Sequence, residues 1–135
     1  LLPYLLGVLC AIVRYRPIRL AFTLEDGRCF ERRITVCAVA NGRYIGGGIP
    51  VAPLALADDG LLDVIIMDSL PRWKMPGFLP GLLAGRILSF PGVESFRCRS
   101  IAFEGQGLHV NVDGDILQMD QAALEVLPGA LRVHA

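Results

Sequence analysis

Alternating apolar and polar residues mark several β-strands along the chain. From Ile18 to Glu25 an Ile, Leu or Phe occupies every second position, which predicts a half-buried strand. Asp26-Gly27 is a hairpin signal, and we expect the return strand to run from about Arg28 to Ala40. The run from Leu61 to Met67 predicts a central strand, but Asp63 interrupts it. An acid there requires a partner, a ligand or an exposed face.

The C-terminal third returns to the strand pattern after a break. Apolar positions between Phe96 and Phe103 change register, as a β-bulge would cause. Asp113-Gly114 predicts a hairpin between two apolar runs, and Pro128-Gly129 predicts a last one. Short strands joined by glycine turns indicate a mainly β fold, either an antiparallel β-sandwich or a barrel.

Two segments interrupt the strands and predict helices. Residues 1–13 are strongly apolar but too few to span a bilayer comfortably, so we expect a buried helix that packs on a partner. Residues 71–88 show helical spacing, yet Pro76 and Pro80 would each remove a hydrogen bond inside a helix. We therefore expect a regular helix only at about 80–88, with Pro80 at its start. Trp73 and Phe78 fit the core better than a lipid-facing surface.

The fold expected from these patterns is an antiparallel β-sandwich with an N-terminal helix and one inserted helix. The 135 residues are 53% hydrophobic and 19% charged, which fits one folded domain and excludes a disordered chain. Net charge is zero, and no basic patch is interleaved with aromatic residues, so we do not expect nucleic acid as a partner. Twelve of the thirteen basic residues are arginines, which suits phosphate contacts but equally reflects the codons of a GC-rich genome.

The cysteines indicate neither a metal site nor a redox site. They are widely spaced, without a CxxC motif or paired histidines nearby. We expect them to be small buried hydrophobic residues in a reducing compartment. The four are Cys10, Cys29, Cys37 and Cys98.

The segment from Ala40 to Asp63 holds the first candidate chemistry. A triple glycine allows close approach of another group to the backbone, and the carboxylates beside a later glycine turn are ligands that a hard cation accepts. Ordinary hairpin turns with solvated acids are the simpler interpretation of both features. The candidate residues are Asn41, Gly46, Gly47, Gly48, Asp58, Asp59 and Asp63.

Four motifs in a fixed order resemble a known family. They are NGRYIGGG (41–48), LADDGLLDVIIM (56–67), VDGD (112–115) and EVLPGALRV (125–133). As a set they are similar to the C-terminal domain of the bacterial diacylglycerol kinase and YegS-like lipid kinases. That superfamily includes sphingosine and ceramide kinases. The resemblance runs over almost the whole chain.

The resemblance implies a β-sandwich domain that shares its active site with an N-terminal domain carrying a GGDGT nucleotide-binding motif. This chain contains no GGDGT and no initiator methionine, so we expect it to be the second half of a longer kinase and inactive alone. The resemblance also implies ATP as co-substrate, bound mainly by the missing domain, and Mg²⁺ as cofactor. The expected acceptor is a hydroxyl of diacylglycerol or a related lipid. The alternative is a non-catalytic lipid-binding or regulatory module derived from that family.

The resemblance also implies a structural magnesium site, with one departure here. The family uses a serine, an aspartate and a main-chain carbonyl, and alignment of DDG places the aspartate at Asp59 and the carbonyl at Leu61. The serine position is Leu56, which has no donor atom. Asp58 or a water takes the place of the serine, or the site is lost.

The implied catalytic base departs from the family as well. The family has a glutamate in a DGE turn, whereas this chain reads Asp113-Gly114-Asp115. Asp115 is one methylene shorter, about 1.3 Å less in reach by ordinary bond lengths. A misplacement of that size can lower a rate by roughly 100-fold. On the residues alone, Asp115 is simply the flank of a type I′ hairpin that Asp113-Gly114 explains.

The implied partners are a lipid substrate, the missing N-terminal domain and a membrane surface. The protein would be cytoplasmic and visit the membrane transiently, through apolar residues near Trp73 and Phe78. The substrate-side cleft is expected to include Asn41, the glycine loop, Asp113 and Gly114. The sequence leaves open whether the protein forms a homodimer.

Overall fold

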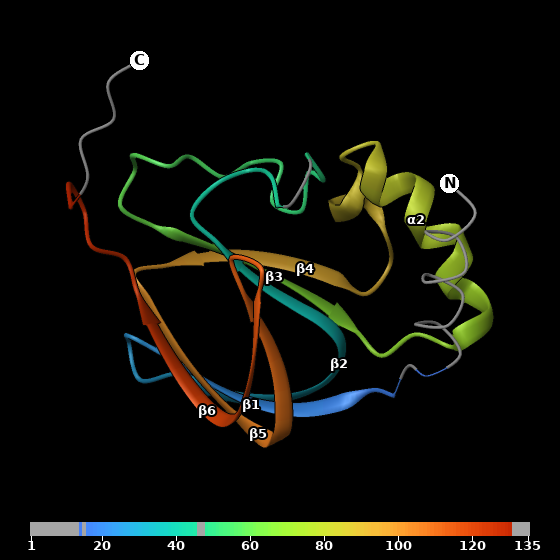
Figure 1. Cartoon of the computed structure of the whole chain (residues 1–135), viewed down its shortest axis with the longest axis horizontal. Coiled ribbons are helices and arrows are strands. Elements are labelled where there is room, and N and C mark those ends of the chain that lie inside the picture. Colours follow the sequence, from blue (N-terminus) through green and yellow to red (C-terminus); the bar gives the residue numbers. More distant parts are fainter. Residues whose placement is uncertain (1–13, 15, 46–47, 131–135) are drawn as a thin grey trace.

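The computed structural model is built around one six-stranded antiparallel sheet, in the order β4-β3-β2-β1-β5-β6 (Figure 1). It describes residues 14, 16–45 and 48–130. The expected helix at residues 1–13 and the end of the last expected hairpin, from residue 131, lie outside the described residues. The strands are β1 Ile18–Leu24, β2 Cys29–Ala40, β3 Leu62–Asp68, β4 Val93–Cys98, β5 Ser100–Val112 and β6 Asp115–Glu125.

The sheet curls on itself instead of forming the two stacked sheets of the expected sandwich. β4 is one edge strand, while β5 pairs with β1 on the far side of β2 and β3. Only Arg99 separates β4 from β5. Two peptide units span at most about 7 Å, whereas four strand spacings cover about 19 Å across a flat sheet. The sheet must therefore bend until the end of β4 meets the start of β5.

This connection also corrects the expected bulge between Phe96 and Phe103. The change of register there marks two separate strands, and Glu25 secures the junction. Its carboxylate accepts hydrogen bonds from the backbone N–H groups of Arg99 at 3.1 Å and Ser100 at 3.2 Å. These two bonds hold the pKa of Glu25 below its ordinary value.

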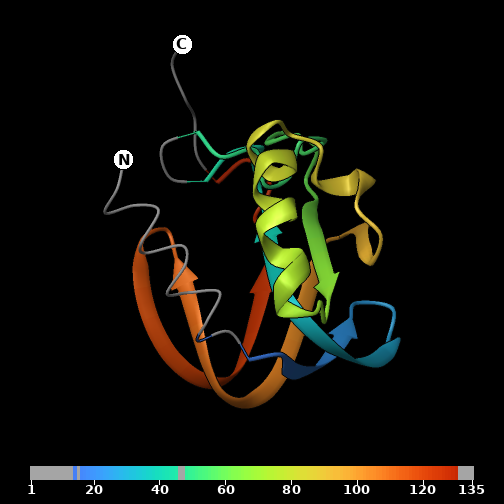
Figure 2. The same ribbon diagram turned by 90° about the vertical axis from the view of Figure 1, so that its right-hand side faces the viewer.

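A register shift does occur, but further along β5, between Glu104 and Leu108. Gly105 lies in this segment, where a Cβ atom would come within 2.7 Å of the Leu20 side chain and 2.9 Å of the Arg19 carbonyl oxygen. Only glycine allows so close an approach of the two strands. Figure 2 shows the result: β5 and β6 bend through the bottom of a deep curve, their hairpin end rises as one arm, and β3 and α2 stand on the other side.

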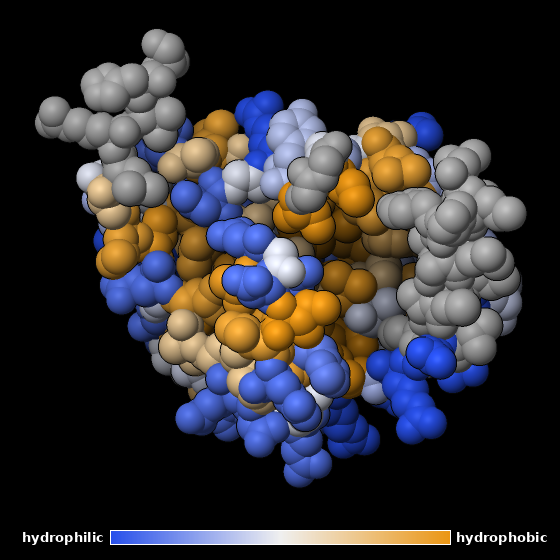
Figure 3. Space-filling model, viewed as in Figure 1, coloured by the Kyte–Doolittle hydropathy of each residue, from blue (hydrophilic) through white to orange (hydrophobic). Residues whose placement is uncertain are grey.

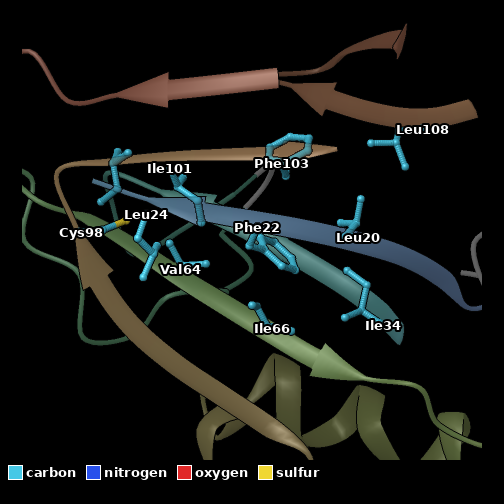
Figure 4. Close-up of a cluster of buried hydrophobic side chains, with 11 residues drawn as sticks. Leu20, Phe22, Leu24, Ile34, Val64, Ile66, Cys98, Ile101, Phe103 and Leu108 are labelled. Carbon is cyan, nitrogen blue, oxygen red and sulfur yellow. The ribbon is translucent and has the colours of Figure 1, made fainter. Parts of the chain in front are cut away.

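The inside of the curve holds the main hydrophobic core (Figure 4). Leu20, Phe22 and Leu24 alternate inward along β1, as the period of two predicts. β3 contributes Leu62, Val64 and Ile66 to this core, and its other face is covered as well. The remaining buried members are Ile34, Cys98, Ile101, Phe103 and Leu108.

A second cluster packs against the outer face of β3. Ile65 and Ala40 of the sheet meet Val51, Ala52 and Ile87 from the loop and helix layer. β3 is thus buried on both faces, which explains its uninterrupted apolar run and confirms it as the central strand.

The inserted helix α2 spans Met75–Leu83, between two 3₁₀ turns at Arg72–Lys74 and Ile87–Ser89. The expected start at Pro80 is therefore wrong, because Pro80 lies inside the helix and Pro76 lies in its first turn. Packing against the second cluster offsets the lost hydrogen bond. The Phe78 and Phe90 rings meet edge to face with centroids 5.0 Å apart.

Exposure corrects two expectations about single residues. Trp73 is 76% exposed and is not a core residue, whereas Phe78 packs on the second cluster. Cys29 is exposed, Cys37 half-buried and Cys98 buried, and Cys10 lies outside the described residues. Burial raises the pKa of the Cys37 thiol to about 12 and that of Cys98 to about 11. Among the described residues, no helix is long and apolar enough to cross a bilayer.

Two glycines of α2 give a matched test of this packing. Gly81→Ala places a Cβ atom 2.1 Å from the Phe90 ring, and Phe90 must shift from its contact with Phe78. We expect a loss of about 1–3 kcal/mol in the free energy of unfolding, measured by denaturant titration. Gly77→Ala meets nothing within 4 Å and should be neutral or stabilising by up to about 1 kcal/mol. Equal effects of the two substitutions would contradict the packing described here.

Candidate functional site

The Asp113-Gly114 turn positions Asp115 at the tip of the β5–β6 hairpin. Asp113 has φ 49° and Gly114 φ 109°, so both central residues adopt positive φ, as a two-residue type I′ turn requires. Asn111 Oδ1 accepts a hydrogen bond from the Gly114 backbone N–H at 2.9 Å. Asp115 follows as the first residue of β6, paired with Val112. The predicted hairpin is confirmed.

Three residues next to Asp115 in the hairpin carry exposed apolar side chains: Val112 and Leu117 on the same face as Asp115, and Ile116 on the opposite face. Val112 is 49% exposed, Ile116 71% and Leu117 46%, and we call these three residues the hairpin patch. Figure 3 shows hydrophobic residues gathered around hydrophilic ones at the centre of this face, where Figure 1 places the hairpin. Asp115 is itself exposed, and its carboxylate makes no hydrogen bond or ion pair with another described residue. A free carboxylate beside apolar surface can orient and deprotonate a hydroxyl group of an amphiphilic molecule.

The acidic turn before β3 is organised by Arg97 of β4. Its Nε donates to Asp63 Oδ1 at 3.2 Å, its Nη1 lies 3.4 Å from Asp59 Oδ2, and its Nη2 donates to the Leu54 carbonyl oxygen at 2.8 Å. We call these four residues the Arg97 cluster. Asp63 is only 5% exposed, so the partner that the sequence required for this acid is Arg97.

The residues of this turn do not fit the expected structural magnesium ion. Asp59 Oδ1 accepts the Leu61 backbone N–H at 3.0 Å, and its Oδ2 faces Arg97. The side chain of Leu56 offers no ligand atom, and Asp58 is exposed. Among the described residues, no group of three or more His, Cys, Asp or Glu side chains is arranged to hold a metal ion.

The glycine loop is described only in part, because Gly46 and Gly47 lie outside the described residues. Asn41 is exposed at the end of β2, and Gly48 has φ 104°. Ile45 and Ile49 exchange two backbone hydrogen bonds at 2.9 and 3.1 Å, which close the loop at its base. Beside it lies an open hollow of about 380 Å³, lined by Arg43, Tyr44, Gly48, Pro50, Pro53, Leu83, Ala84 and Gly85.

The hairpin tip is separate from the other two candidate regions, whereas Arg43 of the glycine loop donates a hydrogen bond to the Ala55 carbonyl oxygen, next to Leu54 of the Arg97 cluster. Among the residues that the structure describes, no hydrogen bond or ion pair joins the hairpin tip to the Arg97 cluster or to the glycine loop. Figure 2 places the hairpin on one arm of the sheet and the loop layer on the other. Sequence reasoning missed Arg97. The acid in β3 signalled that a base was needed, but only the register Asp63↔Arg97 between β3 and β4 identifies which base.

Comparisons with known proteins agree on one family. The whole chain, residues 1–135, matches the family model described as the YegS C-terminal NAD kinase beta sandwich-like domain. The "Probable lipid kinase YegS-like" of Pseudomonas fluorescens is 43% identical over 101 residues, which cover 71% of this chain and 32% of that protein. A diacylglycerol kinase of Mycobacterium tuberculosis is 28% identical over 130 residues, or 96% of this chain and 42% of that protein.

A solved structure shows the same fold. The crystal structure of a protein described as a diacylglycerol kinase, from Bacillus anthracis str. Sterne, superimposes on this chain with a TM-score of 0.68. The two sequences are 25% identical, and the match covers 90% of this chain and 43% of that chain. The chain thus spans between about a third and two fifths of the length of the relatives it matches.

The hairpin geometry can be tested through Gly114. Gly114→Ala forces a side chain into φ 109°, and we expect a loss of about 1–2 kcal/mol in the free energy of unfolding. Gly42→Ala is the matched control, since a Cβ there meets nothing within 4 Å and its φ is ordinary. Denaturant titration of both variants measures the difference. A Gly114→Ala protein as stable as the control would contradict the turn described here.

Proposed function

Because this chain belongs to the YegS C-terminal domain family, whose model it matches over its whole length, we propose that it is the substrate-side domain of a longer lipid kinase. The complete enzyme would transfer the γ-phosphoryl group of ATP to a hydroxyl of diacylglycerol or a related lipid. ATP would be held mainly by a second domain, and Mg²⁺ bound with the nucleotide would neutralise phosphate charge. This domain would supply the surface that receives and orients the lipid.

One observation carries the proposal: the unpaired carboxylate of Asp115 stands in the hairpin patch, at the position that matches the family's DGE glutamate. An acceptor with one polar hydroxyl and long hydrocarbon chains needs both kinds of surface side by side. Asp115 would accept the hydroxyl proton as the oxygen attacks phosphorus. Val112, which pairs with Asp115, and Leu117, two residues further on, share the Asp115 face of the hairpin and would contact the hydrocarbon part of the lipid.

Phosphoryl transfer would require few further catalytic groups from this domain. The transition state is loose, so positioning of the acceptor and stabilisation of phosphate charge supply most of the acceleration. The turn residues Asp113 and Gly114 would hold Asp115 on a rigid two-residue connection. Asn41 and the glycine loop would line the opposite side of a cleft completed by the nucleotide-binding domain.

The domain would act in the cytoplasm at a membrane surface. Trp73 is 76% exposed on the 3₁₀ turn before α2, and Leu83 at the end of the helix is 53% exposed. Large apolar side chains at the surface can insert into the headgroup region of a bilayer. Such contacts would bring the enzyme to its substrate without a spanning helix.

A second candidate function is a non-catalytic lipid-binding or regulatory module. It is favoured by the two departures from the family pattern, Asp115 in place of glutamate and Leu56 in place of serine. This candidate retains the hairpin patch as a lipid contact but assigns no proton transfer to Asp115.

Asp115→Asn in the complete protein separates the two candidates. The amide keeps the size of the side chain but cannot take a proton, so we expect lipid phosphorylation to fall by at least about 100-fold. The measurement is transfer of labelled phosphate from ATP to diacylglycerol in mixed micelles, with magnesium. Asp115→Glu, which restores the reach of the family glutamate, should retain or raise the activity.

The matched control is Glu104→Gln, which removes one exposed carboxylate from the same hairpin, opposite Gln121. It should keep the activity of the unchanged protein, and circular dichroism should show both variants folded. Full activity of Asp115→Asn would refute the catalytic role. Lipid binding without activity in the unchanged protein would favour the second candidate.

A further inference from the structure

The Arg97 cluster has the composition of a cation site, with a guanidinium at its centre. Two carboxylates and one main-chain carbonyl converge on Arg97 from three parts of the chain: the acidic turn, β3 and the loop that holds Leu54. Oxygen ligands of this kind are the ones that Mg²⁺ and Ca²⁺ accept in proteins. Here the three nitrogens of one guanidinium each meet one of these oxygens.

The burial of Asp63 makes the positive charge of Arg97 necessary. The Asp63 side chain is 8% exposed and that of Asp59 19%, whereas Arg97 reaches them from a side chain that is 39% exposed. The deeply buried Asp63 carboxylate is unfavourable unless a positive charge compensates it. Among the described residues, Arg97 is the one base within ion-pair distance of Asp63.

The Asp63 carboxylate has no hydrogen-bond donor among the described residues other than Arg97. Its Oδ2 is buried without a hydrogen-bond partner, so the whole side chain depends on the hydrogen bond that Arg97 Nε donates to Oδ1. In contrast, Asp59 has a second bond, from the Leu61 backbone N–H, which shapes the turn. Loss of Arg97 would therefore leave Asp63 as an uncompensated buried charge.

We propose that the Arg97 guanidinium takes the place of a structural divalent cation in this domain. It ties the acidic turn to β3 and β4 through a side chain that cannot dissociate, and it makes the stability of the domain independent of Mg²⁺. The missing donor at Leu56 is then no defect, because the arginine fork already satisfies the oxygens that a metal would bind. The inference concerns folding of this domain and does not rest on the proposed kinase activity.

The first test is thermal unfolding of the complete protein without nucleotide, in EDTA and in millimolar Mg²⁺. We expect no difference in Tm that depends on Asp59. A rise in Tm with Mg²⁺ that disappears in Asp59→Asn would place a metal at the turn and overturn the proposal. A rise that persists in Asp59→Asn comes from another site and agrees with it.

The second test removes the guanidinium. Arg97→Met keeps the length and apolar stem of the side chain but not its charge, and we expect Tm to fall by about 10 °C or more. Hydrogen exchange should become faster in peptides that cover β3 and β4. Arg99→Met is the matched control, because Arg99 is exposed two residues away and its side chain makes no ion pair with a described residue. Equal Tm values for the two variants would overturn the proposal.

A double variant covers the case in which Arg97→Met does not fold. Asp63→Asn together with Arg97→Met removes the buried charge and its partner at once. It should fold and have a higher Tm than Arg97→Met alone, because no uncompensated carboxylate remains. A double variant no more stable than Arg97→Met would show that the charge of Asp63 does not depend on Arg97, against the proposal.

Discussion

The single-residue connection at Arg99 is the constraint on which the rest of this domain depends. It joins an edge strand to a strand three positions beyond its neighbour, and a connection of that length can exist only if the sheet is bent almost closed at this end. The closed end is held together by backbone and side chain alike. The Arg99 carbonyl oxygen accepts the Val126 N–H at 3.0 Å, and Glu25 binds the N–H groups of Arg99 and Ser100. One sheet thereby encloses a core that two sheets would otherwise be needed to cover.

The curl also decides which parts of the chain remain uncovered. Beyond Gly105 the β5–β6 hairpin has left the neighbouring strand β1, and no other described strand pairs with its tip. Val112, Ile116 and Leu117 are exposed in this part of the hairpin. An apolar surface left open beside a carboxylate is suited to meeting an amphiphile or another domain, and the relatives that this chain matches are more than twice its length. The proposed site thus follows from the way the sheet ends.

Burial of β3 on both faces requires a compensating charge for Asp63. A strand covered by two hydrophobic clusters cannot carry an acid without a compensating charge, and β4 supplies Arg97 at the residue paired with Asp63. The same side chain then reaches Asp59 and the Leu54 carbonyl oxygen, so one arginine organises a turn that sequence comparison would assign to a metal. The pairing of β3 with β4 therefore also fixes the acidic turn, because the Arg97 side chain contacts both.

The sequence by itself determined those features that depend on neighbours along the chain. Alternation predicted β1 and the apolar run predicted β3, and Asp26-Gly27 and Asp113-Gly114 predicted their hairpins, because side-chain period and turn conformation are local properties. Sequence motifs also indicated the family and Asp115 as the candidate base, a role that stays a prediction.

Only the tertiary structure decided what depends on residues distant in sequence. The strand order, the closure at Arg99, the start of α2 before Pro80 and the exposure of Trp73 and Cys29 were not predictable. The sequence showed that Asp63 needed a partner, yet it offers thirteen basic residues. Arg97 is the partner because strand pairing brings it opposite Asp63 from 34 residues away, and such pairing is set by the packing of the whole sheet.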